Sequence, residues 1–427
     1  MSDKTVIAVV GLGYVGLPLA VHLARHFPTI GFDISQERVS ELQRGLDRTG
    51  EVDDDTLRAT SLQLTADAKA MQGADIYVVT VPTPVTEDNQ PDLRPVLSAC
   101  ETVGAVLKAH PVPGAIVCFE STVYPGVTED ICAPALEKAS GLKWGVDFHL
   151  GYSPERINPG DREHTVDRIA KVVAGESPAI TERLCAIYGK VTTGEIFPAR
   201  DIKTAEASKV IENAQRDINI AFINEIARIF QKLDVSVYDV LEASKTKWNF
   251  LNFQPGLVGG HCIGVDPYYL SHCAQALGLE PEVILAGRRI NDGMGDFLAG
   301  AISGQLEEGP KRLLVLGLTF KENVPDLRNS KVVDLVRGLE ALGHSVAVHD
   351  PLADPEEAKQ IYDIDLETSL SDQADYDAVV GAVPHKAYVE LSDTGFEKLV
   401  KTGGLIADVK GMWRHRALPA ALRRWQL

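Results

Sequence analysis

The pattern of apolar and polar positions changes twice along the chain. Its first part alternates short apolar runs with longer amphipathic segments, an order that is typical of strand–helix–strand units on a parallel sheet. Strands are expected over Val6–Val10, Thr29–Phe32, Ile76–Val81 and Ala115–Phe119, and a helix over Leu17–His26.

The middle part has a helical pattern. No proline or glycine occurs between residues 201 and 233, and apolar side chains recur there at intervals of three and four positions. This spacing predicts one helix of about thirty residues, roughly 45 Å long at the rise of an α-helix. A helix of that length usually joins domains or forms a subunit interface. A glycine-rich loop is expected after it, over Trp248–Pro267.

The last part returns to the alternating pattern of the first. The expected elements are strands over Arg312–Gly317, Ser345–His349, Asp377–Val383 and Leu405–Val409 and a helix over Lys331–Leu342. Together the three parts predict an α/β fold, with two doubly wound, Rossmann-like parallel-sheet domains joined by a central helical domain that contains the long helix. The expected domain boundaries are 1–198, 199–302 and 303–427.

Composition narrows the class of function. The chain has 427 residues, with 42 basic and 60 acidic side chains and a net charge of −18. This balance argues against a nucleic-acid partner, which needs a cationic surface. The six cysteines are scattered without a C-x-x-C pair, so neither a disulfide scaffold nor a zinc ribbon is indicated. A cytoplasmic protein is therefore expected.

One uncharged stretch, Thr5–Ala24, is long enough to be a signal peptide or a membrane helix. Three glycines interrupt this stretch and a proline follows them, so a strand, a turn and a helix are the better interpretation. No membrane partner is expected.

The same glycines form a Gly-x-Gly-x-x-Gly motif. Gly11 permits a tight turn after the strand, Gly13 lets the backbone approach a diphosphate, and Gly16 lets the helix pack closely. Asp33, at the end of the next strand, would bind the ribose hydroxyls and repel a 2′-phosphate. NAD is therefore the expected cofactor, and the residues expected to bind it here are Gly11, Gly13, Tyr14, Val15, Gly16 and Asp33.

A second motif surrounds Cys262, which follows Gly259 and Gly260. Glycines at these positions let a substrate or another backbone come close to the thiol. A single cysteine is more often a small buried hydrophobe, whereas a nucleophilic thiolate needs a nearby cation. The His-Cys pairs at 261–262 and 272–273 lack metal-ligand spacing, so no metal is expected.

Four polar side chains are candidate partners for a substrate or for the thiol. Lys209 and Asn213 are four positions apart on the predicted long helix, so both project from one face. Most helix lysines are solvated, and the spacing alone leaves that alternative open. Lys321 and Arg328 lie on a predicted turn of the last part, where they would bind a diphosphate or belong to a solvated loop.

With these features the sequence resembles the UDP-glucose/GDP-mannose dehydrogenase family of NAD-dependent nucleotide-sugar 6-dehydrogenases. The resemblance covers nearly the whole chain. It rests on the glycine motif and on Val81–Thr83, Glu120–Thr122, Ser153–Glu155, Glu206–Asn213, Gly259–Asp266 and Thr319–Arg328. It implies an N-terminal Rossmann domain, a central helical domain with the dimer interface, and a C-terminal UDP-sugar domain. A homodimer or a higher homo-oligomer is therefore expected.

The resemblance implies a four-electron oxidation of a sugar C6 hydroxyl with two NAD per sugar. Cys262 would add to the aldehyde, and oxidation of the thiohemiacetal would give a thioester that water hydrolyses. Lys209 and Asn213 would stabilise the oxygen at C6, and Asp266 would orient water and assist proton transfer. The implied catalytic residues are Cys262, Lys209, Asp266, Asn213, Thr122 and Glu155.

The resemblance also implies contacts with the two ligands. Arg38, Thr83, Thr122 and Arg328 match further cofactor contacts. The residues that match substrate contacts are Glu155, Arg156, Lys209, Asn213, Phe253, Gly259 and Lys321.

Departures from the UDP-glucose enzymes narrow the substrate. Residues 155–160 read Glu-Arg-Ile-Asn-Pro-Gly, and Val265 replaces a lysine. This form resembles the branch that acts on UDP-N-acetylhexosamines. The loop over residues 248–266 looks most like enzymes for UDP-N-acetylglucosamine or UDP-N-acetylgalactosamine, which serve O-antigen and capsular polysaccharide synthesis. UDP-N-acetylmannosamine and UDP-glucose are the alternative substrates.

Two other functions share part of these features. A two-electron hydroxyacid dehydrogenase also has a Rossmann domain, a long helix and a Lys–Asn pair, but it needs neither Cys262 nor a complete third domain. An NAD-responsive regulatory module would keep the fold without the chemistry. The joint presence of Cys262, Lys209, Asn213 and Asp266 disfavours that module.

Overall fold

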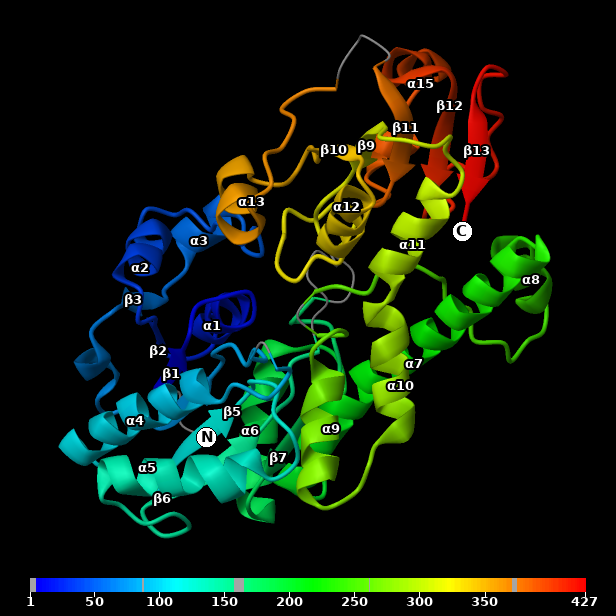
Figure 1. Ribbon diagram of the computed structural model, residues 1–427. Coiled ribbons are helices and arrows are strands. Elements are labelled where there is room, and N and C mark those ends of the chain that lie inside the picture. The colour runs from blue at the N-terminus through cyan, green and yellow to red at the C-terminus, as the bar shows by residue number, and fades with distance from the viewer. Residues whose placement is uncertain (1–4, 87, 157–164, 261, 371–374) are drawn as a thin grey trace. The chain divides into compact units, whose positions relative to one another are not determined.

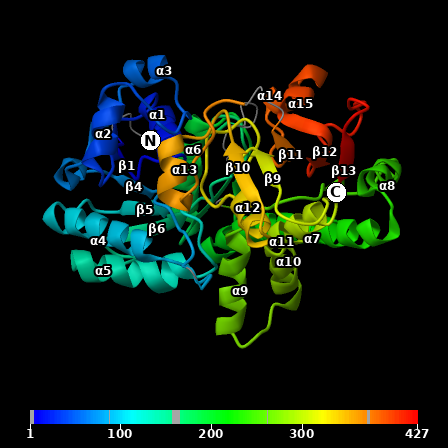
Figure 2. The ribbon, with the colours of Figure 1, turned by 45° about the horizontal axis from the view of Figure 1, so that its top comes forward.

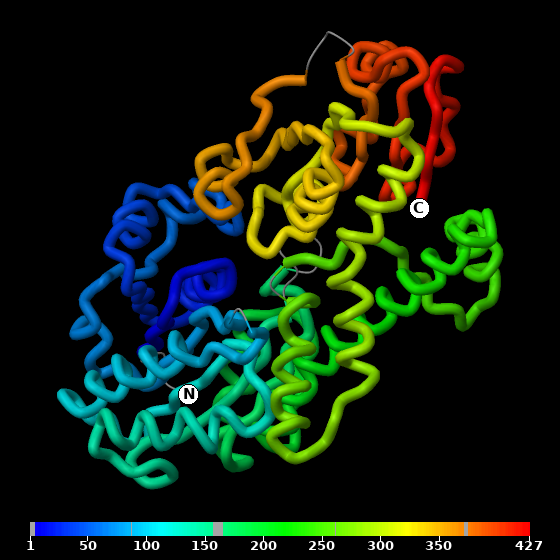
Figure 3. The backbone as a smooth tube through the Cα atoms, in the orientation of Figure 1, coloured from blue at the N-terminus to red at the C-terminus, as the bar shows by residue number. Residues whose placement is uncertain are grey.

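The computed structural model describes residues 5–86, 88–156, 165–260, 262–370 and 375–427 (Figure 3). It divides into two compact units, each built on one sheet (Figure 1). Unit 1 comprises Met1–Glu212 and Tyr268–Leu279, and unit 2 comprises Asn213–Pro267 and Glu280–Leu427. The three-way domain division expected from the sequence stays a prediction.

Unit 1 contains an eight-stranded sheet in the order β3-β2-β1-β4-β5-β6-β7-β8. Neighbouring strands are parallel except β6 and β7, which pair antiparallel, so the sheet is less uniform than the sequence pattern predicts. Its strands are β1 (Ile7–Val10), β2 (Thr29–Phe32), β3 (Gln63–Thr65), β4 (Ile76–Val79), β5 (Ala115–Phe119), β6 (Phe148–Tyr152), β7 (Lys171–Gly175) and β8 (Ile196–Pro198).

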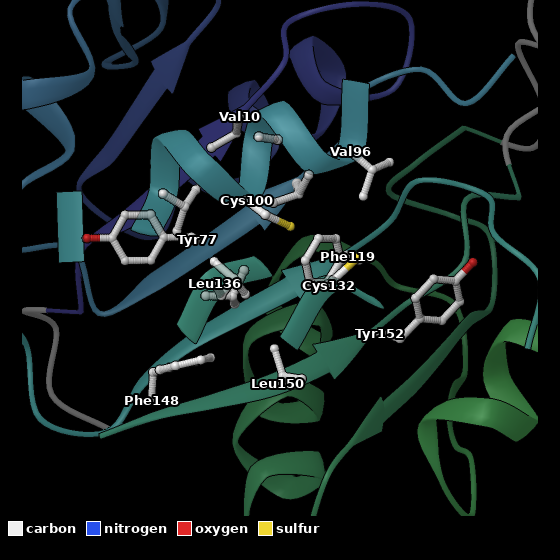
Figure 4. Close-up of a cluster of buried hydrophobic side chains, with 14 of the residues drawn as sticks. Val10, Tyr77, Val96, Cys100, Phe119, Cys132, Leu136, Phe148, Leu150 and Tyr152 are labelled. Carbon is white, nitrogen blue, oxygen red and sulfur yellow. The ribbon is translucent and has the colours of Figure 1, made fainter. Parts of the chain in front are cut away.

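Helices cover both faces of this sheet because alternate strand residues point to opposite sides. Ala8 and Val10 face a core shared with α4 and α5, part of which Figure 4 shows, and Ile7 and Val9 face α1 and α6. The helices of unit 1 are α1 (Gly16–Ala24), α2 (Gln36–Gln43), α3 (Asp54–Ala59), the 3₁₀ helix η1 (Ala68–Met71), α4 (Arg94–Ala109), the π-helical η2 (Val127–Cys132), α5 (Ala133–Ser140) and α6 (Pro178–Val191).

The uncharged stretch Thr5–Ala24 folds as the strand β1, a glycine turn and the helix α1, as its glycines predict. None of the helices formed by the described residues combines the length and the apolar character that a membrane crossing requires.

The predicted long helix is confirmed as α7 (Ile202–Leu233), which has 32 residues. Its apolar pattern covers more than one face, because Ile211, Phe222 and Ile229 are exposed. The helices that follow are α8 (Val237–Ser244), α9 (Asp266–Ala276), α10 (Glu282–Asp292) and α11 (Met294–Ser303).

Unit 2 contains a five-stranded parallel sheet in the order β10-β9-β11-β12-β13 (Figure 2). The strands are β9 (Arg312–Leu316), β10 (Ser345–His349), β11 (Tyr376–Gly381), β12 (Val400–Asp408) and β13 (Arg423–Gln426). The last strand has no counterpart in the sequence expectations. The helices are α12 (Val332–Ala341), α13 (Pro355–Tyr362), α14 (Lys386–Val389) and α15 (Asp393–Leu399).

A buried ion pair joins β7 of unit 1 to the residue that follows β5. The Nζ of Lys171 lies 2.7 Å from Oε2 of Glu120, and the two side chains are 2% and 0% exposed. Tyr188 of α6 donates its hydroxyl hydrogen to the other oxygen of Glu120 at 2.5 Å. The network satisfies both carboxylate oxygens in a place that water does not reach.

Removing one partner of this pair should be costly. We expect Lys171→Met to lower the free energy of unfolding by about 3–5 kcal/mol, because the carboxylate of Glu120 stays buried without its counter-charge. The double variant Glu120→Gln/Lys171→Met removes both charges and should recover most of the loss. Urea unfolding of the three proteins measures the effect, and a double variant as unstable as the single one would contradict it.

A second buried carboxylate, Glu206 of α7, holds the start of η2. Its two oxygens accept the backbone N–H groups of Gly126 at 2.6 Å and of Thr128 at 2.9 Å. Burial raises the pKa of Glu206 to about 7, although these hydrogen bonds favour the charged form.

The raised pKa makes stability depend on pH. The unfolded chain releases this proton near the ordinary value of 4.5, and the folded chain releases it near 7. The contribution of Glu206 is therefore complete below pH 4.5 and is lost as the pH rises to about 7. Relative to Glu206→Gln, the free energy of unfolding of the wild type should fall by roughly 3 kcal/mol over this interval. Denaturation at several pH values measures the free energy of unfolding of both proteins. The prediction is refuted if that free energy changes with pH by the same amount in the wild type and in Glu206→Gln.

Candidate active site

A glycine turn joins β1 to α1 in unit 1. Gly11 has φ = +98°, a conformation that residues with a side chain rarely adopt. A Cβ at Gly16 would lie 1.9 Å from the carbonyl oxygen of Gly11, whereas a Cβ at Gly13 would enter open space. Tyr14 and Val15 complete the turn, and Val15 provides no side-chain cap to α1. A diphosphate at Gly13 would therefore meet the first amides of the helix.

Asp33 follows β2 and faces this turn. Its Oδ2 accepts the N–H of Leu12 at 2.8 Å, and its Oδ1 accepts the N–H of Ser35 at 2.9 Å. The Nε of Arg38 donates to the Leu12 carbonyl oxygen at 3.0 Å, and its Nη2 pairs with Asp47 at 2.7 Å. Arg38 thus stiffens the turn, and its direct contact with a cofactor stays a prediction. The turn, the helix amides and Asp33 fit a dinucleotide such as NAD.

The other predicted residues of the unit 1 sheet follow the carboxyl ends of adjacent parallel strands. Thr83 follows β4, Thr122 follows β5 and Glu155 follows β6. Ser121 links the first two loops, because its Oγ donates to a carbonyl oxygen of the β4 loop at 2.7 Å. Glu155 is 8% exposed and interacts electrostatically with Lys171. The sheet therefore gathers these residues at the edge that carries the glycine turn.

Two further predicted residues of unit 1 involve α7. Lys209 lies on this helix and is 5% exposed. Arg156 pairs with Glu212 of α7 at 3.0 Å and donates to the carbonyl oxygen of Ala170 at 3.1 Å. The guanidinium ties the loop after β6 to the helix segment that contains Lys209. Its contact with a substrate stays a prediction.

In unit 2, Cys262 lies in the turn that precedes α9, and its side chain is half-buried. Its carbonyl oxygen accepts the N–H groups of Val265 at 3.2 Å and Asp266 at 2.9 Å. Asp266, the first residue of α9, is 2% exposed, and the Nδ2 of Asn213 donates to its Oδ2 at 2.5 Å. The structure thus brings Asn213 of α7 to the aspartate that lies four positions after the cysteine. His261 lies outside the described residues.

A pocket of unit 2 opens where the strand order reverses between β9 and β11, the position at which doubly wound sheets bind ligands. The predicted residues Gly259 and Lys321 line it. Lys331, Lys410 and Glu322 line it as well. The lysines give this pocket cationic groups within an acidic chain.

Lys331 and Lys410 were not among the site residues predicted from the sequence. Lys410 comes directly after the predicted strand Leu405–Val409, and that position at a strand end is the signal that would have found it. Its Nζ donates to the carbonyl oxygen of Pro255 at 3.4 Å, and burial lowers its pKa. Lys331 pairs with Asp334 at 3.0 Å.

Two predicted binding residues have partners within unit 2. The Nε and Nη2 of Arg328 donate to the two carboxylate oxygens of Asp326 at 3.0 and 2.7 Å. Phe253 packs against the apolar core of the unit. Their contacts with cofactor and substrate stay predictions.

Asp350 follows β10 as Asp33 follows β2, but its carboxylate is enclosed. Its Oδ2 accepts the N–H groups of Leu318 at 2.6 Å and Thr319 at 2.9 Å and lies 3.0 Å from Nε2 of His385. Burial would raise the pKa of Asp350, but the hydrogen bonds from His385 and the two amides outweigh burial and hold the pKa well below its ordinary range. This buried carboxylate is therefore held by groups of unit 2 itself.

A metal cluster and the cavity of unit 1 were also considered as candidate sites. No three histidine, cysteine or acidic side chains in the described ranges are grouped so that they could hold a metal ion. A cavity of about 510 Å³ in unit 1 is lined by residues such as Glu176, Ser177, Cys185 and Asp201, and none of the predicted site residues is among its lining.

Family models match three successive parts of the chain. The NAD binding domain of the UDP-glucose/GDP-mannose dehydrogenase family matches residues 5–192, its central domain matches residues 203–293, and its UDP binding domain matches residues 314–415.

Individual relatives are similar over nearly the full length. Protein CapL of Staphylococcus aureus is 50% identical over 99% of this chain and 99% of its own. The UDP-N-acetyl-D-glucosamine 6-dehydrogenase of Pseudomonas aeruginosa is 49% identical over 96% of this chain and 97% of its own. Among solved structures, a UDP-D-ManNAc dehydrogenase from Pyrococcus horikoshii superimposes with a TM-score of 0.87 at 29% identity, covering 98% of this chain and 99% of that one. The chain therefore belongs to the UDP-glucose/GDP-mannose dehydrogenase family and is an NAD-dependent nucleotide-sugar 6-dehydrogenase.

Proposed function

We propose that this enzyme oxidises the C6 hydroxyl of UDP-N-acetylglucosamine or UDP-N-acetylgalactosamine to the uronic acid. The observation that carries the proposal is the 49% identity, over 96% of the chain, to the UDP-N-acetyl-D-glucosamine 6-dehydrogenase of Pseudomonas aeruginosa. A protein of the same name from Salmonella typhi is 44% identical over the same share. The Glu-Arg-x-x-Pro-Gly form of residues 155–160 agrees with this branch.

In this proposal the two ligands bind at the carboxyl edges of the two sheets. The glycine turn and Asp33 hold NAD, with Thr83 and Thr122 at the same edge. The diphosphate of the sugar nucleotide binds in the pocket between β9 and β11, where Lys321 and Lys410 supply positive charge. A local cluster of cations suffices to bind a diphosphate to this acidic protein, because the charges of distant carboxylates are screened by salt.

The first oxidation at C6 is assigned to four side chains. When bound, NAD accepts a hydride from C6, once in each of the two oxidation steps. Lys209 stabilises the negative charge that develops as the hydroxyl loses its proton to solvent water, and Asn213 fixes the oxygen by a hydrogen bond. Thr122 and Glu155 are assigned to the surroundings of the reacting carbon.

The second half of the reaction belongs to Cys262 and Asp266. The thiolate adds to the aldehyde carbon, and the resulting thiohemiacetal keeps one C–H bond from which a second hydride leaves. The product is a thioester. Water adds to it and Asp266 accepts one proton of that water. The C–S bond then breaks to release the thiolate, and the carboxylic acid gives its remaining proton to solvent. The hydrogen bond from Asn213 supports this role, because it fixes the orientation of the Asp266 carboxylate.

The proposal also covers the domains, the cellular location and the assembly of the enzyme. The chain has three domains in this proposal: an NAD domain (residues 1–198), a central domain (199–302) and a UDP-sugar domain (303–427). The enzyme is cytoplasmic and serves the synthesis of O-antigen or capsular polysaccharide. A homodimer or larger homo-oligomer forms through the central part. The exposed Ile211, Phe222 and Ile229 of α7 support that assembly, because exposed apolar side chains on one element favour association.

UDP-N-acetylmannosamine is the second candidate substrate. The UDP-N-acetyl-D-mannosamine dehydrogenase of Pyrococcus horikoshii is 34% identical over 81% of the chain. Because this identity is lower than that to the UDP-N-acetyl-D-glucosamine enzymes, UDP-N-acetylmannosamine ranks below the first proposed substrates. UDP-glucose is a third candidate substrate, and a UDP-glucose dehydrogenase from Pyrobaculum islandicum has a similar structure, with a TM-score of 0.83 at 27% identity.

A substrate panel tests the reaction and the sugar together. The purified enzyme is given NAD with UDP-N-acetylglucosamine, UDP-N-acetylgalactosamine, UDP-N-acetylmannosamine or UDP-glucose, and both NADH and consumed sugar are measured. We expect the highest kcat/KM with one of the first two sugars and two NADH per sugar, since the thioester route removes four electrons. A ratio near one would refute the four-electron reaction, and a preference for another sugar would refute the substrate.

Cys262→Ser tests the nucleophile. A hydroxyl is a far weaker nucleophile than a thiolate, so we expect turnover to the uronic acid to fall on the order of a thousandfold or more, with the affinity for NAD unchanged. Cys273→Ser, at another half-buried cysteine, is the matched control and should retain activity within about twofold. Substantial uronic acid formation by Cys262→Ser would exclude the thioester route.

A further inference from the structure

The glycine-rich segment around Cys262 packs closely against Asn329. A Cβ at Gly259 would lie 2.5 Å from the carbonyl oxygen of Asn329, and a Cβ at Gly264 would lie 3.2 Å from its Nδ2. Gly260 exchanges two hydrogen bonds with the same residue: its N–H donates to the Asn329 carbonyl oxygen at 3.2 Å, and its own carbonyl oxygen accepts from Nδ2 at 2.9 Å. The approach of Asn329 thus explains why positions 259 and 264 near the cysteine are glycine.

The backbone at this contact is in unusual conformations on both sides. Asn329 has φ = +52°, a left-handed conformation that asparagine tolerates better than most residues. Gly260 has φ = +84°, and a Cβ there would lie 2.8 Å from the ring of Phe320. In this conformation both the carbonyl group and the side-chain amide of Asn329 reach the cysteine segment. The contact is therefore specific in its geometry.

The two segments that meet at Asn329 also line the pocket between β9 and β11. Gly259 contributes from the cysteine segment, and Phe320, Lys321 and Ser330 contribute from the segment that contains Asn329. A nucleotide held in this pocket would contact both segments at once. Asn329 itself lies outside the pocket lining, next to Ser330.

We propose that Asn329 is a positioning residue that couples nucleotide binding to the placement of Cys262. It fixes Gly259, Gly260 and Gly264 on the segment 320–331, so a nucleotide that orders one segment orders the other. Binding energy from a part of the substrate remote from C6 is then used to orient the nucleophile. The inference rests on the proposed function for the identity of the nucleotide and for the role of the thiol.

Asn329→Gly and Asn323→Gly form a matched pair of variants. Asn323 lies in the same segment with φ = +59°, and its Oδ1 accepts the N–H of Lys386 at 3.0 Å. Glycine adopts positive φ without strain, so each variant loses one side-chain amide and keeps the backbone path. The lost amide contacts the cysteine segment in Asn329→Gly alone.

UDP without the sugar is the probe, because it separates nucleotide binding from turnover. Its affinity is measured by calorimetry, and the rate of Cys262 alkylation by iodoacetamide is followed by peptide mass spectrometry with and without UDP. In the wild type and Asn323→Gly, we expect UDP to slow alkylation at least about fivefold. In Asn329→Gly, the effect of UDP should fall below about twofold while the affinity for UDP changes less than about threefold.

Steady-state kinetics supply a second measurement. We expect Asn329→Gly to lose about tenfold in kcat without a matching rise in KM for the UDP-sugar, and Asn323→Gly to stay within about twofold of the wild type. Equal protection by UDP in all three proteins, or equal kinetic losses in both variants, would overturn the positioning role and leave the proposed function intact. Failure of UDP to bind the wild type would overturn both.

Discussion

Parallel pairing of strands is the constraint on which both candidate sites depend, because it delivers the loops after neighbouring strands to one edge of the sheet. In unit 1 this edge receives the glycine turn, Asp33, Thr83, Thr122 and Glu155. In unit 2 the corresponding edge receives the Phe320 segment after β9 and Lys410 after β12. Residues far apart in the chain therefore become neighbours without any direct attraction between them.

Hydrogen bonds from three asparagine side chains fix the segment that contains Cys262. An amide side chain both donates and accepts, so it can satisfy a backbone peptide on both sides. Asn224 does this at Gly256, where its Nδ2 donates to the carbonyl oxygen at 3.0 Å and its Oδ1 accepts the N–H at 2.7 Å. The segment that contains Cys262 is thus held at its beginning by Asn224, in its middle by Asn329 and at its end by Asn213.

Charge is organised locally in this chain. The net charge of −18 predicts repulsion of polyanions, yet the family binds NAD and a UDP-sugar, which both contain diphosphates. In the proposed assignment, the helix amides near Gly13 and the lysines that line the pocket of unit 2 would meet that requirement at short range. Other charges serve the fold: the Glu120–Lys171 pair is buried, and Asp350 is enclosed by amides and His385. Net charge is therefore informative about polyelectrolyte partners and uninformative about a small ligand.

The sequence by itself determined what local patterns encode. Hydrophobic spacing predicted α7 almost to the residue, glycine chemistry predicted the turn at Gly11, and the ordered motifs identified the family, the fold class and NAD, all of which are confirmed. Only the tertiary structure decided the antiparallel pairing of β6 with β7, the strand β13 and the contact of Asn329 with Gly260, which are 69 positions apart. These features depend on which surfaces pack together, and no periodicity along the chain records that choice.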